Sequence, residues 1–159
     1  FFENQDSNHA FIIKKLLTNA VQKRLMSERS IACLLSGGVD SSIVASLLVK
    51  HFEPNTINTY AIGLKGSEDL HYAQIVADYL KTNHTSIELS FEEFYNAIPQ
   101  VIYQIESYDV TTVRASIGQY LISKHIANKS KDRVIFCGDI SDELFGGYRG
   151  LRDAPNSIS

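Results

Sequence analysis

Four short apolar segments alternate with longer segments of helical periodicity, and this alternation constrains the fold more than any other feature of the sequence. The short segments are IACLL (31–35), INTYAIG (57–63), HTSIEL (84–89) and VIFC (134–137). In the longer segments, apolar residues recur every three or four positions, which places them on one face of a helix. Strands separated by helices form a parallel sheet through right-handed crossovers. The sequence therefore predicts an α/β fold with helices on both faces of a parallel sheet.

The predicted helices fill the segments around these strands. They cover residues 8–26, 41–52 and 68–82, a segment after a Ser90/Glu93 capping box that is divided at Pro99, and a segment that follows the polar stretch 109–116. A length of 159 residues favours one domain, so we expect a single domain over 1–159, with residues 1–29 as a helix leading into it. Because the chain begins with Phe1 rather than Met, we expect it to be a piece of a longer protein.

Charge and composition exclude several classes of protein. The net charge is −3, from 15 basic and 18 acidic residues, which argues against nucleic-acid binding and against a basic membrane-binding patch. No apolar run approaches the roughly 20 residues of a membrane-spanning helix. Two cysteines cannot form a disulfide framework, and they indicate a reducing compartment, which predicts a cytoplasmic protein. Cys33 and Cys137 fall on predicted strands, so we expect both as buried core thiols, and we expect most aromatic side chains in the core as well.

The segment SGGVDSS (36–42) lies between a predicted strand and a predicted helix. Its glycines let the backbone approach an anion, and the free N–H groups of the helix start and the serine hydroxyls can donate to it. Asp40 would repel a phosphate unless a cation lay between them, and Mg²⁺ suits that position. The pattern therefore predicts a phosphate-binding loop without a lysine. The alternative is a plain turn in which Ser and Asp only cap the helix.

A second glycine-rich loop, GDISDELFGGY (138–148), follows the fourth predicted strand and carries Asp139, Asp142 and Glu143. Clustered carboxylates at the end of a strand suggest a metal ligand and a group that positions an amine or ammonium. The alternative is a solvated acidic turn in which Ser141 caps a short helix. Because ligands of such sheets bind beyond the carboxyl ends of the strands, we expect the two loops to face one crevice.

A third segment, residues 108–114, places Arg114 beside the hydroxyls of Thr111 and Thr112. An arginine with neighbouring hydroxyls is suited to binding a carboxylate or a phosphate in a fork geometry. The alternative is a helix N-cap followed by a surface arginine. The segment alone does not decide between these interpretations.

Taken together, these segments resemble one enzyme family. The matching residues are LLSGGVDSS (34–42), AIGLKGSEDL (61–70), VADYL (76–80), VIYQIESYDVTTVRAS (101–116), GDISDELFGGY (138–148) and APN (154–156). In this order they resemble the synthetase domain of glutamine-hydrolysing asparagine synthetases of the bacterial type, which belong to the PP-loop ATP pyrophosphatases. The resemblance implies a Rossmann-like doubly wound fold. It also implies that aspartate attacks ATP to form β-aspartyl-AMP and pyrophosphate, and that ammonia then displaces AMP to give asparagine.

The resemblance also implies roles for individual residues. Ser36, Gly37, Gly38, Asp40, Ser41 and Ser42 match the pyrophosphate loop, Leu35 and Ile62 match positions that contact adenosine, and Cys137 and Gly138 match a Ser-Gly pair at the nucleotide. Asp40 and Asp142 match Mg²⁺-associated carboxylates, Thr111 and Arg114 match residues around the acyl-adenylate, and Glu143 is expected to order its loop. The expected substrates are ATP, aspartate and ammonia. A glutaminase domain is expected in the same full-length protein. The sequence does not decide whether the protein forms a homodimer.

Asp139 and Ile140 stand where the family has Glu and Gly. That Glu is implicated in catalysis, Asp is one methylene shorter, and Ile cannot adopt a positive φ without strain. These departures predict a synthetase that is slow or inactive but still binds ATP. The alternatives are therefore a catalytically weak or silent nucleotide-binding relative, or another PP-loop adenylating ligase such as a β-lactam synthetase. A sulfur-transferring enzyme fits poorly, since no cysteine is expected in an exposed loop.

Overall fold

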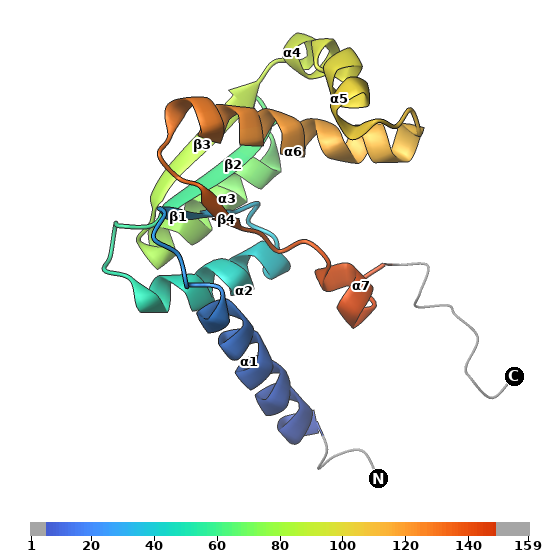
Figure 1. Ribbon diagram of the computed structural model, residues 1–159. Helices are drawn as coiled ribbons and strands as arrows, with labels where there is room; N and C mark the ends of the chain where they lie inside the picture. Colours follow the sequence, from blue (N-terminus) through green and yellow to red (C-terminus); the bar gives the residue numbers. More distant parts are fainter. Residues whose placement is uncertain (1–5, 149–159) are drawn as a thin grey trace, which may run out of the picture.

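The sheet has four parallel strands in the spatial order β3-β2-β1-β4 (Figure 1). The computed structural model describes residues 6–148. The strands are β1 (Ile31–Leu34), β2 (Asn58–Leu64), β3 (Asn83–Leu89) and β4 (Val134–Phe136). The chain moves outward from β1 through β2 to β3 and then returns to add β4 on the other side of β1. The predicted doubly wound α/β fold is confirmed, and the direction of winding reverses between β1 and β4.

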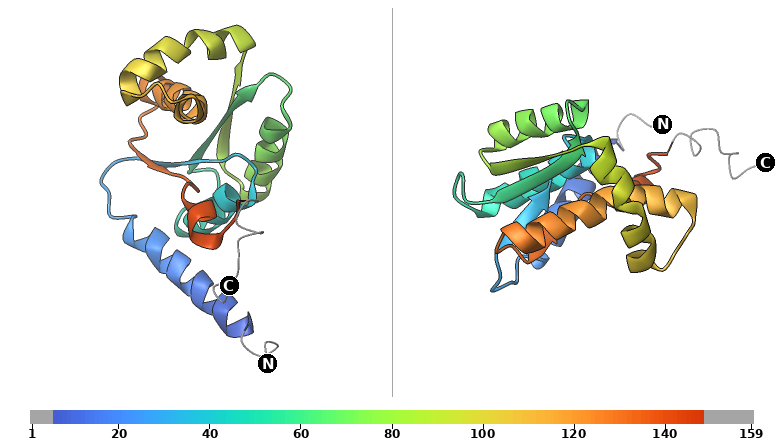
Figure 2. Two further views of the ribbon diagram at one scale, coloured as in Figure 1. Left: turned by 90° about the vertical axis from the view of Figure 1, so that its right-hand side faces the viewer. Right: turned by 90° about the horizontal axis from the view of Figure 1, so that it is seen from above.

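Helices cover both faces of this sheet (Figure 2). In chain order they are α1 (Asp6–Lys23), α2 (Val39–Leu48) with the 3₁₀ turn η1 (Val49–His51), α3 (Glu68–Leu80), α4 (Phe91–Asn96), α5 (Ile98–Ile105), α6 (Val110–Lys129) and α7 (Ser141–Phe145). Helices α2 and α3 pack against one face of the sheet, and α6 packs against the opposite face. Within residues 6–148, no helix combines the length and apolar character needed to cross a membrane.

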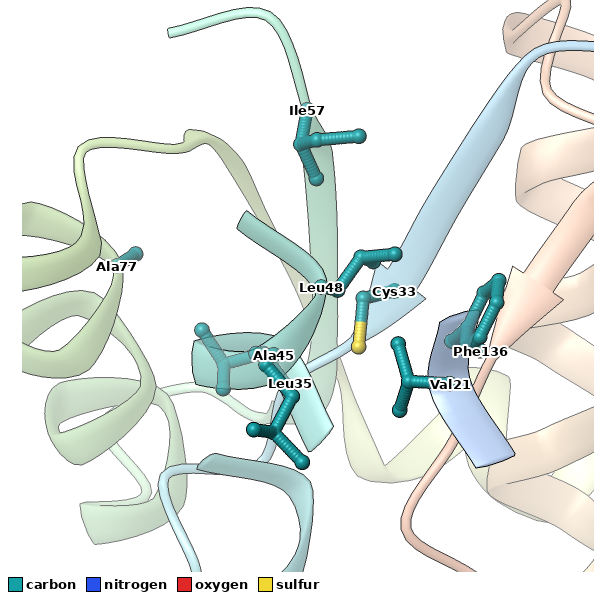
Figure 3. Packing of buried hydrophobic residues seen from close by; sticks show 9 residues of the cluster. Val21, Cys33, Leu35, Ala45, Leu48, Ile57, Ala77 and Phe136 are labelled. Atoms are coloured by element: carbon teal, nitrogen blue, oxygen red, sulfur yellow. The ribbon is translucent and has the colours of Figure 1, made fainter. Parts of the chain in front are cut away.

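The larger core cluster joins the sheet to α1 and α2 (Figure 3). Cys33 of β1 and Phe136 of β4 contribute from the sheet, and Ala45 and Leu48 of α2 and Val21 of α1 contribute from the helices. Cys33 and Leu48 are fully buried. Each fully buried aliphatic side chain of this size contributes about 1.5–3 kcal/mol relative to exposure. This packing holds α2 against the sheet, and α2 follows directly on the loop after β1.

On the opposite face, Ile122 and Ile126 of α6 pack against Ala32 and Tyr60 of the sheet. The N-terminal half of α6 packs instead against α5, through Val113 and Val101. The helix is therefore held at both ends, and its middle passes over the carboxyl ends of the central strands. The expected helix boundaries around Ser90 and Pro99 are confirmed, since Ser90 forms the capping box with Glu93 and the proline lies in the first turn of α5.

A buried carboxylate ties the amino ends of three strands together. Asp132, which is 2% exposed, accepts hydrogen bonds from Asn58 Nδ2 (2.9 Å), Tyr60 Oη (2.7 Å) and Ser130 Oγ (2.6 Å). Ser30, which precedes β1, is a fourth donor. Burial raises the pKa of Asp132, but these hydrogen bonds outweigh burial and hold the pKa below its ordinary value. This network lies at the end of the sheet opposite the two glycine-rich loops.

The structure corrects three sequence-based expectations. The polar stretch 109–116 is not a loop before a helix, because α6 begins at Val110 with Asp109 as its N-cap. Cys137 is exposed, and it follows β4 rather than lying within it. The aromatic residues are only partly core, since the exposed ones include Phe11, Phe91, Tyr72, Tyr79, Tyr95, Tyr103, Tyr108 and Tyr148. The motif APN (154–156) lies outside the described residues.

Candidate functional site

The two glycine-rich loops line one cavity of about 560 Å³ at the carboxyl ends of β1 and β4. The first loop contributes Ser36, Asp40 and Ser41. The second loop contributes Gly138, Asp139, Asp142 and Glu143, among others. This volume is within the usual range of small-molecule sites, about 300–1,000 Å³. The expectation that the two loops face a common crevice is confirmed, and the crevice lies at the switch point of the sheet.

The backbone of the first loop requires glycine at position 37. Gly37 has φ +78°, and a Cβ atom there would lie 2.6 Å from the backbone nitrogen of Ala73 in α3. Gly38 is the N-cap of α2 and supplies no side chain to the helix N-terminus. The first N–H groups of α2 are therefore not capped by Ser or Asp. This excludes the alternative in which the serines and Asp40 serve only as helix caps.

The serine hydroxyls join the loop to the helix. Ser36 and Ser41 lie with their Oγ atoms 3.0 Å apart, and Ser41 Oγ also accepts from the Ser36 backbone N–H at 3.2 Å. Ser42 Oγ donates to the Gly38 carbonyl at 2.6 Å. Ser36 and Ser41 line the cavity, whereas Gly37, Gly38 and Ser42 belong to the same loop and do not line it. The predicted phosphate-binding residues thus divide into a lining group and a supporting group.

The second loop lies directly on α2. A Cβ atom on Gly138 would stand 2.7 Å from the backbone nitrogen of Ser41, so only glycine allows this approach. The next residue, Asp139, directs its carboxylate toward α6, where Oδ2 accepts from Gln119 Nε2 at 3.5 Å. The Cys137 thiol lies beside the same carboxylate. Burial is the largest cause that raises the pKa of this thiol, and the Asp139 charge also raises it.

Ile140 has φ +76° and forms the N-cap of α7. This left-handed conformation is costly for a β-branched residue, as the sequence led us to expect. Ser141 is not the N-cap that the alternative interpretation required, because it is the first residue of α7 and its Oγ donates to the Gly138 carbonyl at 2.8 Å. The loop therefore carries local strain directly beside its carboxylates.

Asp40 and Asp142 enter the cavity from opposite loops. Among the described residues, no group of three or more His, Cys, Asp and Glu side chains could hold a metal ion. Mg²⁺ does not require such a cage, since it is usually held by one or two carboxylates, with phosphate oxygens and water as the other ligands. The two carboxylates beside the glycine-rich first loop therefore suit a metal ion that also takes phosphate oxygens as ligands.

Glu143 is held by Tyr148 at the far side of the second loop. Tyr148 Oη donates to Glu143 Oε1 at 2.6 Å, which lowers the pKa of the Glu143 carboxyl and raises the pKa of the Tyr148 hydroxyl. Sequence reasoning did not single out Tyr148. Tyr148 lies five residues after Glu143, across the turn that ends α7. This spacing is the signal that could have indicated the hydrogen bond between Tyr148 and Glu143.

Leu35 and Ile62 line a smaller neighbouring cavity of about 210 Å³ between β1, β2 and α6. This cavity shares Leu34, Ser36, Ala115 and Gln119 with the larger one, so the two are adjacent. Its walls are mostly apolar, and Leu35 is 1% exposed. A flat apolar group could occupy the smaller cavity while a charged group attached to it reaches the first loop.

Thr111 and Arg114 are not in the cavity that the loops share. Both are exposed residues in the first two turns of α6. Arg114 lines an apolar cavity between α4, α5 and α6, beside Phe94 and Ile98. The α6 residues that do reach the loop cavity are Ala115, Ser116 and Gln119. Thr111 and Arg114 thus precede Ala115, the first α6 residue that lines the loop cavity, and Arg114 lines a different cavity.

Gln119 is the residue of α6 that sequence reasoning missed. It lies in one helical row with Ala115, Ile122 and Ile126, and the two isoleucines of that row face the sheet. A polar residue within an otherwise apolar row is a signal readable from the sequence. The neighbouring Ser116 also lines the cavity and was likewise not predicted.

Comparison with known proteins places this geometry in a family. Residues 13–159 match the family model described as asparagine synthase. Glutamine-hydrolysing asparagine synthetases from human, rat and chicken (Gallus gallus) are 46%, 45% and 47% identical over 148 residues. These alignments cover 91% of this chain but 26% of each relative. The three relatives are vertebrate proteins and leave the narrower expectation of a bacterial-type member untested.

Solved structures with the same fold include an ammonia-dependent NAD synthetase from Campylobacter jejuni in complex with the nitrate ion. It has a TM-score of 0.57 and 20% identity, with 86% of this chain and 59% of that chain covered. An NMN synthetase from Francisella tularensis gives a TM-score of 0.55 at 19% identity, over 85% of this chain and 56% of that one. The family model covers nearly the whole chain, and the structural matches support the same doubly wound fold. The chain therefore belongs to the asparagine synthase family.

Proposed function

We propose that this chain is the ATP-binding part of a synthetase domain that converts aspartate and ammonia to asparagine. The observation that carries the proposal is the single cavity that the loop after β1 and the loop after β4 share at the switch point. The names of the relatives support the same activity, and the chain spans 26% of their length. The activity of the whole protein is therefore part of the proposal.

In this proposal the first loop holds the pyrophosphate of ATP. The uncapped N–H groups at the start of α2 and the hydroxyls of Ser36 and Ser41 donate to it. Adenosine occupies the smaller cavity beside Leu35 and Ile62. Cys137 and Gly138, which line the larger cavity, bring the backbone of the second loop against the nucleotide. Asp40 and Asp142 would hold Mg²⁺, which when bound offsets the charge of the phosphates.

The first chemical step joins the two anionic substrates. A β-carboxylate oxygen of aspartate attacks the α-phosphorus, the bond from that phosphorus to the bridging oxygen breaks, and pyrophosphate leaves with the electron pair. Positive groups must offset the repulsion between the substrates before this attack. We assign that role on the aspartate side to the positive charge of Arg114, and we assign the neutral Thr111 hydroxyl a hydrogen bond to the same substrate. This assignment requires the acyl substrate to extend from the cavity along the N-terminal half of α6, past Ser116.

In the second step, ammonia attacks the acyl carbon of β-aspartyl-AMP, and the bond from that carbon to the phosphate oxygen breaks. The nitrogen then carries a surplus proton. Asp139, at the edge of the cavity, is the carboxylate placed to accept it. Glu143 keeps the second loop ordered through its hydrogen bond from Tyr148. In the full-length cytoplasmic protein, we propose that a glutaminase domain of the same chain supplies the ammonia.

The test uses the full-length protein with ATP, Mg²⁺, aspartate and ammonia. We expect AMP, pyrophosphate and asparagine in equal amounts, and no pyrophosphate without aspartate. A protein that binds ATP but releases no pyrophosphate with aspartate would contradict the ligase proposal. Pyrophosphate release with another carboxylic amino acid instead of aspartate would move the proposal to a different adenylating ligase.

A second candidate function is a silent nucleotide-binding relative. The observation that favours it is Ile140, whose φ of +76° strains the loop next to Asp139. Such a protein would bind ATP through residues 36–42 and form no acyl-adenylate. The assay above separates the two candidates, since ATP binding without aspartate-dependent chemistry is the outcome that the silent relative predicts.

A further inference from the structure

Among the described residues, Gln119 is the one polar side chain of α6 that lines three cavities. It lines the large cavity of the two loops, the smaller cavity beside Leu35, and a third cavity of about 460 Å³ along β4. Leu34 of β1 also lines all three cavities and is apolar. The Gln119 amide is therefore a polar group at the junction where the three cavities meet.

The amide faces one carboxylate there. Gln119 Nε2 lies 3.5 Å from Asp139 Oδ2, at the outer limit of a hydrogen bond. Catalytic hydrogen bonds are often long without substrate and shorten in the substrate complex. The carboxylate also lies beside the Cys137 thiol, but a thiol is only a weak donor. Of these two neighbours of the Asp139 carboxylate, the Gln119 amide is thus the stronger hydrogen-bond donor.

The backbone around Asp139 cannot adjust freely. On one side, Gly138 is pressed against the first turn of α2. On the other side, Ile140 has a left-handed conformation at the start of α7, and its carbonyl accepts a hydrogen bond from the Leu144 N–H at 3.1 Å. Because the backbone is held on both sides, the direction of the Asp139 carboxylate depends on its side-chain partners. A carboxylate that must meet a reacting group is sensitive to displacements of about 1 Å.

We propose that Gln119 is a positioning residue that aims the Asp139 carboxylate into the shared cavity. Gln119 acts through Asp139 and does not itself take part in bond making or breaking. This inference rests on the proposed function, because it assigns Gln119 to the step in which Asp139 accepts a proton. It explains how a short carboxylate in a strained loop is held toward the substrates.

The first test measures aspartate-dependent pyrophosphate release by the full-length protein. Gln119→Met keeps the size of the side chain and removes the donor, so kcat should fall about 10- to 100-fold while the Kd for Mg·ATP changes less than about twofold. Gln119→Glu places a like charge next to Asp139, so its kcat should fall further than that of Gln119→Met. Gln74→Met is the matched control, since Gln74 donates to Asp78 at 2.8 Å on the exposed side of α3 and lines none of the cavities described above. It should leave both quantities unchanged.

The second test asks whether the effect passes through Asp139. In an Asp139→Asn background, Gln119→Met should cost less than about twofold in the residual rate, because the carboxylate that it positions is gone. The same loss in both backgrounds would overturn the proposal, and so would a Gln119→Met enzyme with the kcat of the wild type. A wild type that releases no pyrophosphate would overturn the proposed function, and the positioning role with it.

A third measurement detects the contact without activity. In full-length protein labelled with ¹⁵N in glutamine side chains, the Gln119 amide signal is identified by its loss in Gln119→Met. Asp139→Asn should shift this signal and leave the Gln74 signal in place. An unshifted Gln119 signal would overturn the pairing even in an active enzyme, which distinguishes failure of this inference from failure of the proposed function.

Discussion

Gly138 and Ser41 approach so closely that a Cβ atom on Gly138 would lie 2.7 Å from the backbone nitrogen of Ser41. The same Cβ would lie 2.9 Å from the carbonyl carbon of Asp40, so the neighbours are backbone atoms and cannot rotate away. The loop after β4 is therefore seated on the first turn of α2. This contact sets the spacing between the loop at residues 36–42 and the carboxylates of the second loop.

Gly138→Ala should separate the two loops. We expect weaker binding of Mg·ATP by calorimetry and a loss of about 1–3 kcal/mol in the free energy of unfolding, because overpacking against backbone cannot be relieved by a rotamer change. Gly118→Ala is the control for stability, since its Cβ would meet its nearest neighbour at 3.9 Å and a helical alanine is favourable. Wild-type ATP affinity in Gly138→Ala would show that the loops can part without consequence.

Asp40→Asn should weaken ATP binding in a way that depends on Mg²⁺. The amide cannot offset the metal charge as the carboxylate does, so the phosphates are less well compensated. When full-length wild type and Asp40→Asn are titrated with ATP, the variant should bind ATP more weakly than the wild type in the presence of Mg²⁺. In EDTA the two proteins should bind ATP equally well. Asp78→Asn, on the exposed surface of α3, should behave as the wild type. Equal losses with and without Mg²⁺ would remove the metal role from Asp40.

Arg114→Lys tests whether the aspartate side of the site extends along α6. Lysine keeps the charge but loses the planar fork, so aspartate-dependent turnover should fall well beyond any change in stability. The KM for aspartate should rise while the Kd for ATP stays constant. Full turnover in Arg114→Lys would leave Arg114 as a surface residue of the apolar cavity between α4 and α6, where the structure places it.

The sequence predicted the fold and the main cavity because these follow from local signals. Strand and helix periodicity gave the parallel sheet, and glycine-rich turns after two strands indicated where the loops would meet. The exposure of Cys137 escaped prediction because β4 ends at Phe136, one residue earlier than the apolar run suggested. The sequence did not show that Arg114 lines a different cavity, because this depends on where α6 begins and how it crosses the sheet. Gln119 escaped because its contact with Asp139 joins residues 20 positions apart.

Asp132 should contribute to stability with a defined pH dependence. Its folded-state pKa lies below the ordinary value of 3.8, so its contribution is present above that value and is lost as the pH falls through the folded-state pKa. Asp132→Asn leaves buried donors without acceptors and should cost about 2–4 kcal/mol near neutral pH. Calorimetric unfolding should show a constant difference from wild type between pH 5 and 8, and a smaller difference below about pH 4. A difference that changes between pH 6 and 8 would point to another titrating group.

The strained loop offers the sharpest test of how active the protein is. Ile140 holds φ +76°, where glycine is unstrained, and Asp139 is one methylene shorter than the Glu that the resemblance in sequence implies at this position. We therefore expect a slow synthetase that binds ATP normally. Asp139→Glu combined with Ile140→Gly should raise aspartate-dependent formation of AMP and pyrophosphate in the full-length protein. Ile140→Gly alone should relieve about 1–2 kcal/mol of backbone strain, which thermal unfolding can detect.

The comparison must be made at saturating ATP, because the double change acts on the second loop and not on residues 36–42. If the wild type already turns over at about 1–10³ s⁻¹, the rates of ordinary enzymes, the loop has adapted to Asp-Ile and the strain carries no catalytic cost. Loss of activity in the double variant would lead to the same conclusion. In that case Asp139 is a working catalytic carboxylate whose reach is set by its partners, and Gln119→Met should then reduce the wild-type rate more than the rate of Asp139→Glu.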